Sequence, residues 1–344
     1  MASLQESEIA SLTMGRGNNG YATNTVFGYE AGKNTSTGSF ITAIGHRAGF
    51  CTTYCNNSTF IGFNSGCLNN ANLNVFIGSA AGMSNSSGEK NVVVGRCAGY
   101  NKLDRSVAIG NKALACGSSG YYDSVAIGNG ANRQSSLKSV NIGEGAGFAS
   151  GTGAVRTVNI GHLAGQFAYC GSNVTIGACA GRFGTQCNAT QIGFYAYGAY
   201  NTNNKFVLGR YSTSNSYIYV SWTNVSDSRD KTNVETLSDN LGLNFIRKLR
   251  PISFKYDSRT PYMFKCGFEY GDKDGTLKKN ECNYGFLAQE IEQAAKDLNV
   301  KFDGVSYDTY NDKYGVQILE LLSPIVKSIQ ELNNELDNIE KQII

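Results

Sequence analysis

A short motif recurs twelve times in the first two thirds of the chain, and it constrains the possible folds more than any other feature. Each unit has a few apolar residues that end in Gly, followed by two variable residues and, in most units, a small pair. The anchor glycines recur every 15 to 18 residues and are Gly28, Gly45, Gly62, Gly78, Gly95, Gly110, Gly128, Gly143, Gly161, Gly177, Gly193 and Gly209. Such a regular period predicts an architecture in which each unit packs against its neighbours.

The residues of one unit predict a short strand followed by a turn. Alternating β-branched residues favour a strand with one face inward, and we expect Val125 and Ile127 to lie on that inward face. The small residue three positions after the anchor glycine predicts a second short strand close to the axis of the stack. Because a unit this short cannot close a core alone, the sequence predicts a β-solenoid with about 4.8 Å between successive strands.

Two units carry a resemblance to a known family. SVAIGNGA at 124–131 and SVNIGEGA at 139–146 resemble the head repeats of YadA-type trimeric adhesins. The resemblance extends over roughly residues 20–210. It implies a β-roll in which three parallel chains pack into one rod.

The composition changes near residue 226. Residues 1–225 hold 14 Lys and Arg against 7 Asp and Glu, whereas residues 226–344 hold 16 against 20. The basic residues of the first part form no run, which argues against a nucleic-acid partner. The predicted parts are an N-terminal segment at 1–19, the solenoid at 20–212, a connecting neck at 213–225 and a second domain at 226–344.

The cysteines and histidines do not favour a metal site. The ten cysteines form no CxxC pair, and the only histidines, His46 and His162, follow anchor glycines as turn residues. The first residues lack the layout of a secretory signal, so disulfides are disfavoured and we expect buried free thiols. No apolar run reaches the roughly 18 residues of a membrane span. We expect no metal, no other cofactor, and assembly in the cytoplasm.

The most specific motif of the chain begins directly after the predicted neck. Ser226, Asp227, Arg229 and Lys231 match the S-D-x-R-x-K entry motif of the intramolecular chaperone domain at the end of endosialidases and many viral tail fibres. This part of the chain resembles that family. The resemblance continues through LRPISFKYD at 249–257, YGFLAQEIEQ at 284–293, VSYD at 305–308 and IQEL at 329–332.

The resemblance implies a domain that trimerises the fibre before it and then cuts itself away. Ser226 would be the nucleophile and Lys231 its base, with Val225–Ser226 as the scissile bond, while Asp227 and Arg229 would shape the site. A lysine that packing removes from water can serve as such a base, and serine–lysine pairs are a known form of nucleophilic catalysis. Because Ser-Asp is also a common helix cap, a domain that trimerises without cutting stays an alternative.

Two further residues belong to the motif pattern without a defined role. Gln289 and Glu290 lie in the AQE of the family pattern and open a predicted helix. They either brace the site or are ordinary residues of a first helical turn.

The last residues predict a coiled coil. Apolar residues step alternately by three and four positions, which is a heptad seam. Leu and Ile are mixed across both seam positions, and this mixture favours three strands over two. Pro324 predicts a kink or a helix start. The seam consists of Leu322, Ile325, Ile329, Leu332, Leu336, Ile339 and Ile343.

These patterns predict a mostly β, homotrimeric viral fibre or tail spike: a trimeric β-solenoid followed by a small α+β chaperone domain that ends in a long coiled-coil helix. We expect a virion location, attachment to the particle through the N-terminus, and a host-surface receptor or glycan as partner. A glycan-degrading enzyme in the shaft is disfavoured, because its few acidic residues, including Asp104 and Asp123, form no clustered pair. A bacterial or viral trimeric adhesin that is not cleaved stays an alternative.

Overall fold

The chain divides into two compact units, residues 1–216 and residues 217–344. The first is a β-solenoid and the second is a small α+β domain with a long C-terminal helix, so the mostly β fold class is confirmed. The computed structural model describes residues 7–9, 12–18, 20–115, 120–133, 137–148, 154–182, 187–196, 203–209, 223–257, 259, 261–264, 267–308 and 312–343.

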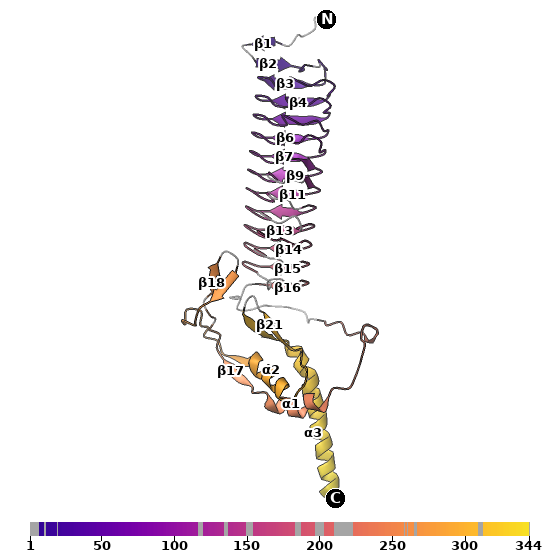
Figure 1. The fold of residues 1–344 in the computed structure, drawn as a ribbon, viewed down its shortest axis with the longest axis vertical. Helices are drawn as coiled ribbons and strands as arrows, with labels where there is room; N and C mark the ends of the chain where they lie inside the picture. The colour runs from indigo at the N-terminus through magenta and orange to yellow at the C-terminus, as the bar shows by residue number, and fades with distance from the viewer. Residues whose placement is uncertain are drawn as a thin grey trace. The chain divides into compact units, whose positions relative to one another are not determined.

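Each of the twelve glycine-anchored units contributes one short parallel strand, and the strands stack in sequence order (Figure 1). Equivalent positions of successive units are paired, as Val125 pairs with Val107 on one side and with Val140 on the other. The strands are β3 (Thr25–Gly28), β4 (Ile41–Ile44), β5 (Ser58–Ile61), β6 (Val75–Ile77), β7 (Val92–Val94), β9 (Val107–Ile109), β11 (Val125–Ile127), β12 (Val140–Ile142), β13 (Val158–Ile160), β14 (Val174–Ile176), β15 (Thr190–Ile192) and β16 (Phe206–Leu208).

The N-terminal end of the stack differs from the rest. Strand β2 (Leu12–Gly15) pairs antiparallel with β3, and β1 (Ser7–Ile9) pairs antiparallel with β2. A second, two-stranded parallel sheet lies on another side of the coils and consists of β8 (Leu103–Asp104) and β10 (Tyr121–Tyr122). The described strands of this unit thus form one long sheet and one short one.

The inward face of the strands is the opposite of the expected one. In β11, Ala126 is fully buried, whereas Val125 is half-buried and Ile127 is 36% exposed. The same alternation recurs along the stack, for example with Phe76 and Val93 buried at the centres of β6 and β7. The prediction that Val125 and Ile127 face inward was wrong, because a narrow coil has room for only the central residue of each strand.

The turn after each strand depends on glycine. From Gly28 to Gly193 the anchor glycines have φ between +125° and +137°. A Cβ atom on Gly128 would lie 2.5 Å from the carbonyl oxygen of Gly143 in the next coil, and the same collision recurs at successive anchors. Glycine is therefore required both by the backbone conformation and by the close approach of successive coils.

The small residue after the anchor lies in a turn. Ala31 and Ala48 are fully buried, as expected for residues near the axis, but they are not part of a strand. The preceding residues Glu30 and Arg47 have positive φ, which interrupts an extended conformation. The predicted second strand at this position was therefore wrong. Backbone bonds between coils nevertheless continue, as Gly32 N–H donates to the Ala48 carbonyl at 2.9 Å.

A buried polar ladder, which the sequence interpretation missed, joins successive coils. In nine of the twelve units an Asn, Ser or Thr lies four residues before the anchor glycine. Asn74 Oδ1 accepts from the backbone N–H of Asn91 at 3.0 Å, and Asn91 Oδ1 accepts from that of Ser106 at 2.9 Å. These side chains satisfy backbone donors where the strands begin. The recurrence of Asn, Ser or Thr four residues before the anchor glycine is the sequence pattern from which this ladder could have been predicted.

The cysteines follow the prediction only in part. Cys55, Cys67 and Cys179 are buried free thiols, but Cys282 is an exposed one. Cys170 and Cys187 form a disulfide that links two successive coils, so the expectation of thiols alone was wrong for this pair. Stacking of the coils places residues that are 17 positions apart side by side. A search for closely spaced cysteines, such as a CxxC motif, does not find such a pair.

The second unit packs helices and hairpins around a small core. Phe245, Ile291, Ala294, Ala295 and Leu321 form its buried centre. The helix α3 begins two residues before Pro324, in agreement with the predicted helix start. The elements are η1 (Ser228–Asp230), η2 (Asp239–Leu241), α1 (Leu243–Lys248), β17 (Ile252–Phe254), β18 (Pro261–Phe264), β19 (Gly267–Tyr270), β20 (Asn283–Gly285), α2 (Ala288–Asp297), β21 (Val305–Asp308), β22 (Lys313–Val316), η3 (Ile318–Leu321) and α3 (Leu322–Ile343).

Candidate functional site

The candidate site lies on the short 3-10 helix η1. Asp227 caps this helix, because its Oδ1 accepts from the backbone N–H of Arg229 at 2.9 Å. The Arg229 guanidinium also binds the Asp227 carboxylate, with Nη2 2.6 Å from Oδ2. The hydrogen bond from the Arg229 side chain lowers the pKa of Asp227 below its ordinary value. Asp227 and Arg229 therefore interact with each other and hold the turn.

The turn brings Ser226 and Lys231 together. Lys231 Nζ donates to Ser226 Oγ at 2.5 Å, and the Lys231 backbone N–H donates to the Ser228 carbonyl at 3.3 Å. Serine and lysine five positions apart thus contact across one helical turn. A hydroxyl with an amine at this distance can transfer its proton to that amine when the amine is neutral.

The site is open to water in a single chain. Ser226 and Lys231 are exposed, and Val225, which carries the carbonyl that Ser226 would attack, is 88% exposed. Helix η1 packs against no other helix or strand among the described residues. Nothing in the described part of one chain removes the Lys231 ammonium from water.

The two residues at the start of α2 lie in a different set of contacts. Glu290 binds the Arg250 guanidinium, with Nε 3.3 Å from Glu290 Oε2 and a second contact through Arg250 Nη2. This hydrogen bond raises the pKa of Arg250. Gln289 is exposed. The sequence analysis did not single out Arg250, although this residue lies within the segment 249–257 that resembles the family.

The seam residues lie on one helix and are all exposed in the single chain. Their exposed fractions run from 38% at Ile325 to 79% at Ile343. The seven positions lie on α3, so the helix presents an apolar stripe over its whole length. An apolar stripe of this length on one helix is typical of a surface that another helix covers.

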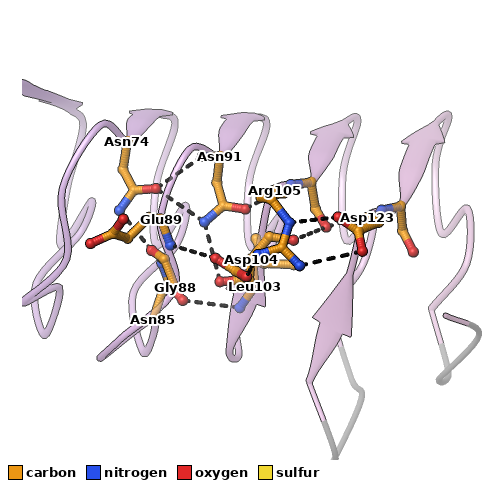
Figure 2. A network of polar contacts seen from close by, with 11 residues as sticks. Asn74, Asn85, Gly88, Glu89, Asn91, Leu103, Asp104, Arg105 and Asp123 are labelled. Carbon is orange, nitrogen blue, oxygen red and sulfur yellow. Dashed lines mark hydrogen bonds and ion pairs between the residues drawn. The ribbon is translucent and has the colours of Figure 1, made fainter. Parts of the chain in front are cut away.

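The acidic residues of the shaft come closer together than the sequence predicted. Arg105 binds both Asp104 and Asp123, which come from successive coils (Figure 2). Asp104 Oδ1 also accepts from the backbone N–H of Glu89 at 3.0 Å. Arg105 lowers the pKa of Asp123, so this carboxyl stays ionised. Glycoside hydrolysis needs a carboxylic acid with a raised pKa, and this cluster does not supply one from Asp123.

The described residues include neither a cluster of metal-ligating side chains nor a membrane-spanning helix. No group of three or more His, Cys, Asp or Glu side chains in the described part of the chain could hold a metal ion. None of the helices described here combines the length and the apolar character needed to cross a membrane.

The fold and the site together define a class: a β-solenoid joined to a small α+β domain that carries a serine–lysine pair at its start and an apolar helix at its end. In agreement with this class, residues 226–299 match the family model described as the chaperone of endosialidase. The match begins at Ser226 and covers the segment with the pair, η2, α1 and α2. No curated protein and no solved structure matched the chain. The resemblance of the repeats to adhesin heads stays a prediction.

Proposed function

We propose that the chain is the subunit of a homotrimeric attachment fibre, whose C-terminal domain assembles the trimer and then releases itself by cleavage at Val225–Ser226. The observation that carries this proposal is the 2.5 Å contact between Lys231 Nζ and Ser226 Oγ, next to an exposed peptide bond and at the first residue of the chaperone match. The virion location and a host-surface receptor or glycan as partner belong to the same proposal.

Two apolar surfaces support assembly into a trimer. The first is the seam on α3. The second is the outer face of the long sheet, where aliphatic side chains repeat in register from coil to coil. A stripe this long on a folded chain favours burial against further copies of the same stripe. Its more exposed members are Ile44, Ile77, Val92, Ile109, Ile127, Ile160, Ile176 and Leu208.

Cleavage would proceed by an acyl shift followed by hydrolysis. Ser226 Oγ attacks the carbonyl carbon of Val225 while Lys231, in its neutral form, takes the hydroxyl proton. The C–N bond breaks, the proton passes to the departing α-amine of Ser226, and an ester joins Val225 to Ser226 Oγ. Water then hydrolyses this ester. Because burial disfavours a charged ammonium, packing of the site in the trimer would supply the neutral amine.

Release of the domain would leave the shaft kinetically trapped. A solenoid trimer that has lost its assembly domain persists when the barrier to unfolding is high. Its persistence then does not depend on whether separated shaft chains could assemble again without that domain. One cut per chain would therefore make assembly irreversible.

The test is the intact mass of the purified protein under denaturing and native conditions. The wild-type chain is expected to give fragments of 225 and 119 residues, and Ser226→Ala and Lys231→Met are expected to stay at 344 residues. Ser228→Ala is the matched control, because this exposed serine is two positions away in the same turn, and it is expected to cleave normally. Two fragments from Ser226→Ala would exclude Ser226 as the nucleophile, and a monomer under native conditions would exclude the trimer.

A further inference from the structure

Two charged residues of α3 lie against the chain that leads to the candidate site. Lys327 and Glu331 have side chains that are only 20% and 22% exposed. Lys327 Nζ lies 2.8 Å from Asp239 Oδ1, and Glu331 Oε2 accepts from the backbone N–H of Leu243 at 2.7 Å. Both contacts are made to residues 236–243, which we call the root segment.

The contact of Glu331 with the root segment is close. A Cβ atom on Gly242 would collide with both carboxylate oxygens of Glu331, so the carboxylate lies directly on the Gly242 backbone. Lys327 Nζ is 3.5 Å from Glu331 Oε1 and connects the two interactions. The hydrogen bond with Asp239 raises the pKa of Lys327, which keeps this amine charged. Asp239, Lys327 and Glu331 together form a polar latch between η2, α1 and α3.

The latch lies beside the seam. A pocket of about 320 Å³ is lined by the root residues Thr236 and Leu237 and by the first turns of α3. Leu322, the first seam residue, is part of its wall. A second helix that packs on the seam therefore lies next to the root segment as well.

The root segment in turn limits the position of the candidate site. Lys231 is five residues before Thr236, so it cannot be more than about 17 Å from it. No other element of the described chain holds η1.

We infer that Lys327 and Glu331 are positioning residues for the cleavage reaction: they fix the root segment to the assembly helix, so that joining three seams places Ser226 and Lys231 for the cut. This inference rests on the proposed self-cleavage. The two residues do not touch the reacting atoms and act through the root segment. Assembly and cleavage are thereby coupled through one set of side-chain contacts.

The test measures cleavage and assembly separately for each variant. Lys327→Met removes the ion pairs with Asp239 and Glu331, and Lys327→Arg keeps a positive charge that can pair with both carboxylates. Lys296→Met is the control, because it makes the same substitution at an ion pair within α2, with Glu292 at 3.1 Å, that does not reach the root segment. The cleavage rate is followed on denaturing gels after synthesis in a cell-free reaction, and the trimer fraction is measured by native mass spectrometry.

We expect Lys327→Met to form trimers like the wild type but to cleave about tenfold more slowly, and we expect Lys327→Arg to keep most of the rate. Lys296→Met should match the wild type in both measurements. Wild-type cleavage by Lys327→Met trimers, or a loss of rate that only follows a loss of trimer, would overturn the inference. An uncleaved wild-type chain would instead contradict the proposed function itself, so the two failures are distinguishable.

Discussion

At the scale of single residues, the candidate site was named by a resemblance to a known family, whereas its surroundings could not be predicted from the sequence. That resemblance implied a pair of Ser226 and Lys231, and the structure places Lys231 Nζ 2.5 Å from Ser226 Oγ. The cap that holds this turn, between Asp227 and Arg229, follows from residue types that favour such caps. The exposure of the pair to water depends on which surfaces cover it, and a local motif carries no information about that.

The buried cysteines give a prediction at the same scale. Burial raises the pKa of the Cys55 thiol to about 11, so at pH 8 only about one molecule in a thousand carries the reactive thiolate. We expect iodoacetamide at pH 8 to label the exposed Cys282 within minutes and to leave Cys55 unmodified in the folded chain. Peptide mapping by mass spectrometry measures both. In denaturant the two should react alike, and rapid labelling of Cys55 without denaturant would contradict its burial.

At the scale of elements, the period of the repeat predicted the strands correctly. The errors, which are the inward face of the strands and the second strand of each unit, arise from the conformation of the turns. Alternation within three residues does not distinguish the inner face from the outer one, which is why Val125 and Ile127 were assigned inward. The space inside a coil depends on the buried turn residues, such as Ala31 and Ala48, and on positive φ at the residues before them. Those backbone angles belong to the turn and leave no periodic pattern of hydrophobicity.

Two glycines of one coil test the requirement for close stacking. Gly128→Ala would place a Cβ atom 2.5 Å from the Gly143 carbonyl oxygen at φ +134°, and we expect a loss of about 4 kcal/mol or more. Gly130→Ala meets no atom within 4 Å at φ +62°, and we expect a loss of about 1–2 kcal/mol. Thermal unfolding of the purified protein compares the two. Equal unfolding temperatures for both variants would refute the collision between coils.

At the scale of the whole molecule, the proposed trimer orders the events of assembly. Pairing between units that are 15 to 18 residues apart is non-local, and such pairing nucleates slowly. A helix seam forms from contacts within a few turns and can align three chains first. The heptads predicted the helix seam, but the aliphatic stripe on the outer sheet face became visible only with the orientation of the strands.

A seam variant tests whether the helix leads the assembly. Leu336→Glu places a charge at the middle of the seam, where Leu336 is 54% exposed in the single chain, and we expect loss of the trimer and, with it, of cleavage. Asn334→Glu adds the same charge two positions away, outside the seam, and should assemble normally. Native mass spectrometry measures the trimer, and denaturing gels measure cleavage. Trimers of Leu336→Glu would show that assembly begins elsewhere.

The two antiparallel strands at the N-terminal end of the stack have a consequence for whether solenoids can join end to end. Identical rungs piled in one direction could in principle add further molecules end to end, as amyloid does, because an open rung offers unpaired backbone groups. Here β1 and β2 replace the next rung by a hairpin-like pair, so an incoming molecule finds a surface unlike its own last rung. Addition of identical rungs at that end of the stack is thereby disfavoured.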